Sequence, residues 1–175
     1  MGLGLGYNEI ISVASAVAHN KPLSELHSYE SHPWLRENFL GWLNGQAMSL
    51  SSVYHRIVEL AASEFRVRAR EVFDSLKSMK EQKSFMLHES LPLEFNESKN
   101  YNVIYYDMFS GKMNLPYWEE DFFKHFLQFN AGTPCHFATY AATGKLKRAL
   151  KGSGFQIVSK SGFSGKRQST YAKKP

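Results

Sequence analysis

The sequence of 175 residues contains a single cysteine, Cys135, and so no pair of thiols that could form an internal disulfide. No apolar run approaches the roughly 20 residues that a membrane-spanning helix needs. No basic segment precedes an apolar stretch as it would in a signal peptide. We therefore expect Cys135 to be a small buried side chain in a reducing, cytoplasmic setting, with no membrane partner.

Metal-ligand spacings are also absent, because none of the seven histidines lies four residues from another, as paired ligands on one helix would. The adjacent residues Cys135 and His136 would point to opposite faces of a strand, so they are not expected to act together. We therefore predict no metal site, and we interpret the histidines as surface residues or as core residues with hydrogen-bond partners.

Acidic residues are missing from one third of the chain. Residues 122–175 contain ten lysines and arginines and no acid, whereas residues 1–121 carry a net charge of −5. A basic segment of this size favours an anionic partner, and nucleic acid is the usual one. The alternative is a solvated surface that ends in a frayed basic tail.

What is present is a globular composition with alternating helix and strand patterns. Apolar spacing predicts helices over 10–18, 34–43, 51–80 (one or two), 118–130 and 145–152. Strand patterns occupy 23–30, 84–88, 101–106, 136–140, 155–159 and 168–172. This alternation predicts a single α/β domain with a mostly parallel sheet and an antiparallel pair at its C-terminal edge. The strand at 101–106 is nearly all apolar, which predicts burial on both faces.

Three glycines alternate at the start of the chain, at Gly2, Gly4 and Gly6, immediately before the first helix. Glycines at such positions let the backbone approach a ligand, and the following helix offers its N-terminus to a polar group. A turn without any ligand remains an alternative, because this spacing differs from the dinucleotide-binding pattern.

Two acidic residues follow predicted strands. Glu30 ends the strand after the glycine loop, where an acid can accept hydrogen bonds from both hydroxyls of a ribose. Asp107 ends the most apolar strand, and ligands of open α/β sheets bind beyond the carboxyl ends of the strands. The alternatives are a surface glutamate for Glu30 and a helix cap or turn residue for Asp107.

Five segments carry a resemblance to a known family. They are GLGLGYN at 2–8, YESHP at 29–33, DMFSGKMNLPYW at 107–118, ATYAATG at 138–144 and GFSGKR at 162–167. In this order they resemble the methyltransferase domain of the MnmC type, which acts on the wobble uridine of bacterial tRNA. The resemblance implies a Rossmann-like class I methyltransferase fold and S-adenosylmethionine as cofactor.

The resemblance also implies roles for individual residues. The residues implied to hold the cofactor are Gly2, Gly4, Gly6, Asn8, Glu30, Glu89 and Asp107. Asp107 would also face the reacting amine as the catalytic residue. The methyl acceptor would be the primary amine of 5-aminomethyl(-2-thio)uridine. Phosphates of the tRNA would be bound by Lys147, Arg148, Lys166 and Arg167.

Aromatic residues after Asp107 offer a further expectation. Phe109 and Trp118, with Tyr117 beside it, would stack on the flipped wobble base, as aromatic side chains do in proteins that bind single-stranded RNA. The alternative is that these aromatics belong to the core.

The sequence departs from the family at several positions. Met108 and Gly111 replace a glycine and a proline, and His88-Glu89 replaces the usual glycine and aspartate. No strand precedes Gly2, so we expect that the first, central strand is missing and that the natural protein is longer. Other readings are a methyltransferase for a small molecule or protein, and an inactive, truncated RNA-binding paralogue. The sequence does not indicate an oligomeric state.

Overall fold

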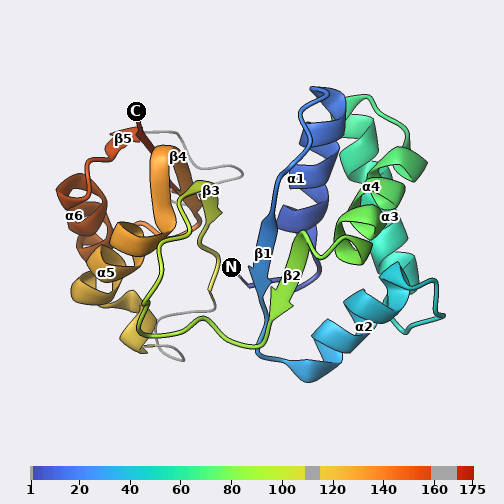
Figure 1. Cartoon of the computed structure of the whole chain (residues 1–175), viewed down its shortest axis with the longest axis horizontal. Coiled ribbons are helices and arrows are strands. Elements are labelled where there is room, and N and C mark those ends of the chain that lie inside the picture. The colour runs from blue at the N-terminus through green and yellow to red at the C-terminus, as the bar shows by residue number, and fades with distance from the viewer. Residues whose placement is uncertain (1, 109–114, 159–168) are drawn as a thin grey trace. The chain divides into compact units, whose positions relative to one another are not determined.

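A computed structural model describes residues 2–108, 115–158 and 169–175 and divides the chain into two compact units, Gly2–Leu91 and Pro92–Pro175 (Figure 1). Each unit contains both helices and strands. The division does not test the expectation of a single methyltransferase domain, which stays a prediction.

The unit Gly2–Leu91 alternates helices with two strands. Its elements are α1 (Tyr7–Ala18), β1 (Leu26–Tyr29), α2 (Pro33–Leu43), α3 (Ser51–Phe65), α4 (Ala69–Glu81) and β2 (Phe85–His88). The two strands pair in parallel, with Leu26 opposite Phe85 and Tyr29 opposite His88. These elements confirm the predicted helices and strands of this half, and the segment 51–80 forms two helices.

The core of this unit is aromatic. Phe39 and Trp42 of α2 are buried beside Tyr54 of α3, with ring centroids 5.1–5.5 Å apart. Ile10 of α1 and Leu76 of α4 are buried in the same cluster. Apolar residues three or four positions apart share one helix face, so each helix contributes a continuous apolar stripe to this core.

The unit Pro92–Pro175 contains a sheet with the strand order β3-β4-β6-β5. Its described elements are β3 (Tyr101–Tyr105), the 3-10 helix η1 (Leu115–Trp118), α5 (Glu120–Asn130), β4 (Ala131–Thr139), α6 (Gly144–Gly152), β5 (Gln156–Val158) and β6 (Thr170–Lys174). Strands β3 and β4 are parallel, whereas β6 is antiparallel to both β4 and β5. The predicted antiparallel C-terminal edge is confirmed, with β6 inside and β5 outermost.

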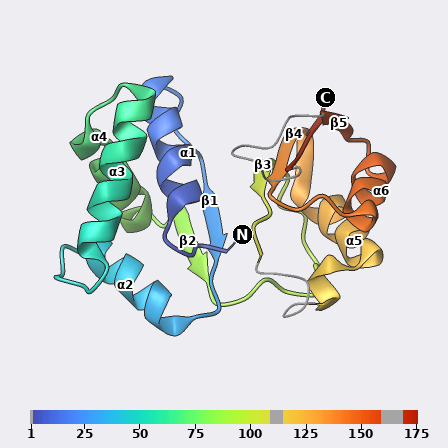
Figure 2. The same cartoon turned by 180° about the vertical axis from the view of Figure 1, so that it is seen from behind.

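Both helices of this sheet lie on the same side of it (Figures 1 and 2). Phe123 of α5 and Leu146 of α6 are buried on that side, as is Phe137 of β4. The prediction that 101–106 is buried on both faces is wrong, since Val103 is 52% exposed while Ile104 is buried. The physical reason is that this unit places no helix from its described residues on the second face of the sheet.

The α/β class, with parallel strand pairs and an antiparallel C-terminal edge, is confirmed. The additional strand expected before Gly2 stays a prediction. Among the helices in the described ranges, none is both long enough and apolar enough to cross a lipid bilayer.

Candidate active site

The glycine loop of the first unit is fastened to the end of β1. Gly2, Gly4 and Gly6 all have positive φ angles, of 83°, 51° and 73°. The N–H groups of Gly2 and Leu3 both donate to the carbonyl oxygen of Tyr29 at 3.0 Å. Because L side chains rarely adopt such angles, glycine is the residue that allows this path of the backbone.

The glycines differ in what surrounds them. A Cβ atom on Gly6 would lie 2.4 Å from Cε2 of the buried Phe39 ring, so Gly6 is needed for close packing of the loop on α2. A Cβ atom on Gly4 would meet no atom within 4 Å. The backbone of Gly4 is therefore open on the side where a ligand could approach.

Glu30 directly follows β1 and connects the loop to this strand. Its Oε2 atom accepts a hydrogen bond from the Gly4 N–H at 3.0 Å, and its Oε1 atom accepts one from the His32 N–H at 2.9 Å. The residue is only 6% exposed. A carboxylate offers about four acceptor positions, so these two bonds leave capacity for hydroxyl donors of a ribose.

Arg36, which the sequence did not single out, joins the ends of β1 and β2. Its Nη1 atom donates to the carbonyl oxygen of Glu30 at 2.6 Å, and its Nη2 atom lies 3.1 Å from Oε1 of Glu89. Glu30 and Glu89 are thereby held at neighbouring strand ends, as predicted, although the Glu89 carboxylate is exposed. Asn8 lies in the first turn of α1, where its carbonyl oxygen accepts a bond from Ser12.

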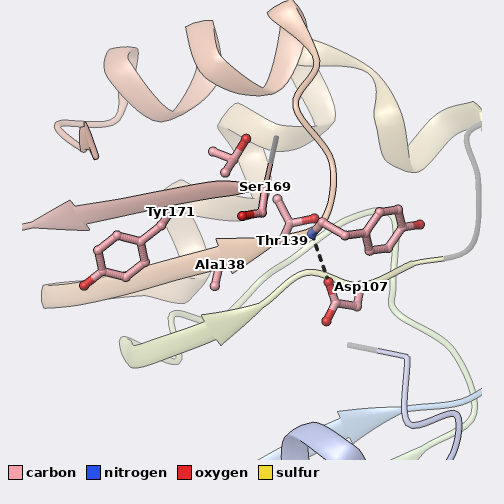
Figure 3. Close-up of a pocket in the computed structure, with 7 residues that line it drawn as sticks. Asp107, Ala138, Thr139, Ser169 and Tyr171 are labelled. Atoms are coloured by element: carbon pink, nitrogen blue, oxygen red, sulfur yellow. Dashed lines mark hydrogen bonds between the residues drawn. The ribbon is translucent and has the colours of Figure 1, made fainter. Parts of the chain in front are cut away.

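Asp107 of the second unit lies just beyond the carboxyl end of β3, as the sequence predicted. Its Oδ1 atom accepts a hydrogen bond from the backbone N–H of Tyr140, which follows the parallel neighbour β4, at 3.3 Å (Figure 3). An open pocket of about 410 Å³ lies here, and ligand pockets span roughly 300–1,000 Å³. The pocket is lined by Asp107, Ala138, Thr139, Tyr140, Ser169, Thr170 and Tyr171.

Tyr140 is a second residue that the sequence analysis missed. The residue is 53% exposed, and its hydroxyl donates to the carbonyl oxygen of Met108. Partial burial, and then the charge of Asp107, raises the pKa of this phenol. The sequence contained a signal for Tyr140, because both strands, β3 and β4, were predicted. Residues that follow neighbouring parallel strands meet at the carboxyl edge of the sheet.

Trp118 lies in the aromatic core of this unit. It is 9% exposed, and its ring centroid is 5.6 Å from that of Tyr106 and 5.9 Å from that of Phe123. This position fits the alternative of a core aromatic, with Tyr140 at 6.4 Å as a more exposed neighbour. Phe109, the other aromatic expected to stack on a base, lies outside the described residues.

The basic helix α6 is partly neutralised. Arg148 Nε lies 2.7 Å from Glu120 Oε2, and Lys145 Nζ lies 2.6 Å from Glu119 Oε2. Both acids lie just before the acid-free segment 122–175. Because they pair with two of its basic residues, the net charge counted from the sequence of this segment is larger than its unpaired charge. Within the described ranges, the C-terminal third has four lysines with no carboxylate partner: Lys147, Lys151, Lys173 and Lys174. Lys166 and Arg167 lie outside those ranges.

The single cysteine is buried, and several histidines have hydrogen-bond partners. Cys135 is buried as predicted, and burial raises the pKa of its thiol to about 11. His27 Nδ1 lies 3.1 Å from His88 Nε2, and His136 Nδ1 lies 2.7 Å from the Tyr171 hydroxyl. Across the part of the chain that the structure describes, no three His, Cys, Asp or Glu side chains are placed to hold a metal ion.

Comparison with known proteins identifies the class. A family model described as S-adenosyl-L-methionine-dependent methyltransferase matches residues 87–175, just over half of the chain. The chain therefore belongs to this methyltransferase family, and S-adenosylmethionine is its cofactor. Its α/β architecture is consistent with the Rossmann-like fold of such enzymes.

Two curated relatives are both named tRNA 5-methylaminomethyl-2-thiouridine biosynthesis bifunctional protein MnmC. The protein of Paraburkholderia phymatum is 28% identical over 181 aligned residues, which cover 95% of this chain and 25% of the relative. The protein of Pseudoalteromonas atlantica is 32% identical over 83 residues, covering 47% of this chain and 12% of the relative. The chain thus spans about a quarter of the length of the first relative.

Proposed function

We propose that this chain transfers a methyl group from S-adenosylmethionine to the primary amine of 5-aminomethyl(-2-thio)uridine at the wobble position of tRNA. The observation that carries the proposal is Asp107, a carboxylate at an open pocket beyond parallel strands of a methyltransferase. The relatives' name supports tRNA as the acceptor. Such a substrate would place the protein in the cytoplasm.

The glycine loop and Glu30 fit an adenosine-containing cofactor. Gly4 presents an open backbone, and Glu30 keeps acceptor positions for ribose hydroxyls beyond its bonds to Gly4 and His32. S-adenosylmethionine supplies an electrophilic methyl group on a sulfonium sulfur. The residues that would hold it are Gly2, Gly4, Gly6, Asn8, Glu30 and Glu89.

Methyl transfer to an amine is a direct displacement, in which the nitrogen forms the new bond and the sulfur leaves with the electron pair. The amine must be the free base, aligned with the methyl carbon. Asp107, held by a hydrogen bond from the Tyr140 N–H, would accept a hydrogen bond from the amine. Its main role is orientation, because a carboxylate also favours the unreactive ammonium form.

Replacement of Asp107 by asparagine tests this role. We expect Asp107→Asn to lower the rate of methyl transfer to tRNA that carries 5-aminomethyluridine by roughly 100-fold or more. The affinity for S-adenosylhomocysteine should change far less, because the proposed role of Asp107 is to orient the methyl acceptor. Asp121→Asn on α5 is the matched control, since its carboxylate is exposed. A rate equal to that of the wild type would remove Asp107 from the mechanism.

The tRNA contacts are proposed with one adjustment. Lys147 has no carboxylate partner among the described residues. Arg148 forms an ion pair with Glu120, so it would have to exchange that carboxylate for a phosphate. Lys166 and Arg167 remain proposed phosphate ligands from the sequence alone. Phe109 remains the proposed stacking partner of the wobble base, and Trp118 is a core residue whose ring lies beside that of Tyr140.

A further inference from the structure

The second face of the sheet in the unit Pro92–Pro175 is polar and aromatic. Side chains of β4 alternate, so Cys135 and Phe137 are buried against the helices while His136 is exposed on the other side. In β6, Ala172 is buried and Lys173 is exposed. This alternation defines a face that neither α5 nor α6 covers.

Strand register arranges this face in two rows. One row contains Val103, His136 and Lys173, and the next contains Tyr105, Ala138 and Tyr171. His136 and Tyr171, one from each row, are bonded to each other, with 2.7 Å between Nδ1 and the hydroxyl oxygen. Their rings are nearly parallel, at 17°, with centroids 6.0 Å apart. The two rings, nearly parallel and joined by a hydrogen bond, form the aromatic surface of this face.

This aromatic surface is continuous with the pocket at Asp107. Ala138 and Tyr171 line that pocket together with Asp107, and Figure 3 shows Ala138 between Asp107 and Tyr171. Ala138, which has a small methyl side chain, belongs to the lining that includes Asp107 and Tyr171. An extended ligand that enters the pocket at Asp107 can continue over Ala138 to Tyr171 and His136.

The chemistry of the face favours a single-stranded polyanion with flat bases. Bases stack on aromatic rings without regard to sequence, and lysines bind the accompanying phosphates. Lys173 has no carboxylate partner among the described residues, and the unit Pro92–Pro175 carries a net charge of +6. An apolar protein partner would find only Val103 as a large aliphatic side chain in these two rows.

We propose that the face defined by His136, Tyr171 and Lys173 binds a nucleotide of single-stranded RNA next to the one whose base enters the Asp107 pocket. Tyr171 and His136 stack on this neighbouring base, and Lys173 binds a phosphate beside it. This inference rests on the proposed function, because it assigns the target nucleotide to the Asp107 pocket. It makes these three residues determinants of the preference for RNA over free nucleosides.

The test measures the binding of a fluorescent oligouridylate by anisotropy, without any methyl transfer. Tyr171→Leu removes the ring, and we expect it to weaken binding roughly ten- to a hundredfold. Tyr171→Phe keeps the ring and loses only the hydroxyl, so its affinity should stay close to that of the wild type. Equal affinities of the Leu and Phe variants would overturn the proposal.

A second variant keeps the test decisive if Tyr171→Leu fails to fold. Lys173→Gln changes an exposed side chain and should reduce the salt dependence of log Kd by about 0.7 for a single strand. Lys151→Gln removes the same charge on α6 and is the matched control. Its salt dependence of log Kd should stay close to that of the wild type. An unchanged salt slope in Lys173→Gln would contradict the proposal.

Two outcomes separate this inference from the proposed function. Oligouridylate binding that depends on Tyr171, without methylation of any tRNA, would support the RNA surface and overturn the proposed reaction. Methylation of tRNA with equal kcat/KM in the wild type and Tyr171→Leu would support the reaction and overturn the RNA surface. Self-association that is lost in Tyr171→Leu, with no oligouridylate binding, would assign the face to a second copy and overturn the proposal.

Discussion

At the scale of single residues, the glycines of the N-terminal loop serve different purposes. Gly6 allows the loop to pack on Phe39, whereas Gly4 leaves open space and donates its N–H to Glu30. The same residue type thus supports close packing at one position and, in the proposed function, access for the cofactor at the other. Substitution by alanine should separate the two effects.

Gly6→Ala is expected to destabilise the protein by about 2–5 kcal/mol. The new Cβ would require a positive φ angle, which costs roughly 1–2 kcal/mol, and would overlap a buried ring, which costs roughly 1–3 kcal/mol more. Gly45→Ala is the control, because Gly45 has a φ of 79° and no atom within 4 Å. Urea denaturation should show a loss of only about 1–2 kcal/mol for the control. Equal losses would mean that Phe39 makes room for the Cβ.

Sequence reasoning placed the two acids of the candidate site at strand ends and missed the groups that hold them. Glu30 and Asp107 could be predicted because each directly follows a strand. Arg36 could not, because nothing in its local pattern shows that its guanidinium spans Glu30 and Glu89. Tyr140 could have been found, since it follows the parallel neighbour of the strand that Asp107 ends.

At the scale of elements, α5 and α6 are linked by ion pairs from an acidic cluster. Glu119 and Glu120 bind Lys145 and Arg148, and Glu120 also binds Lys124 on its own helix. Hydrogen bonds from Lys124 and Arg148 lower the pKa of the Glu120 carboxyl. Because the folded-state pKa is the lower one, this contribution to stability is present at neutral pH and lost as the pH falls through it.

Glu120→Gln should therefore lower the melting temperature slightly at pH 7 and not at acidic pH. The effect at neutral pH is small because the pair is solvent-screened. Below the folded-state pKa the wild-type carboxyl is protonated, so both proteins should melt alike. The measurement is a pair of calorimetric scans at each pH, with Asp121→Asn as the control. A difference that grows in acid would show that the ion pairs are not its cause.

The elements themselves were largely predictable, and their exposure was not. Helices and strands followed from apolar spacing, because a buried stripe or alternation is visible within a short segment. The strand around Val103 was expected to be buried on both faces, yet the described helices of its own unit cover only one face. Which face a helix packs against depends on connections across the whole unit, and local patterns do not contain that information.

At the scale of the whole molecule, charge is divided between the two units. Gly2–Leu91 carries a net charge of −1, and Pro92–Pro175 carries +6. The proposed cofactor-binding glycines and Glu30 belong to the first unit, and Asp107 belongs to the second. We therefore expect the attraction for tRNA to come mainly from the second unit, with binding that weakens as salt rises.

The most direct test of the proposed reaction is methyl transfer to two matched tRNAs, one carrying 5-aminomethyluridine at the wobble position and one carrying unmodified uridine. The full chain is incubated with S-adenosylmethionine, and the tRNA is digested for mass analysis of its nucleosides. The account predicts one added methyl on the aminomethyl nucleoside and none on the unmodified tRNA. Cofactor binding without a methylated nucleoside, or faster methylation of a free amine or a protein, would contradict it.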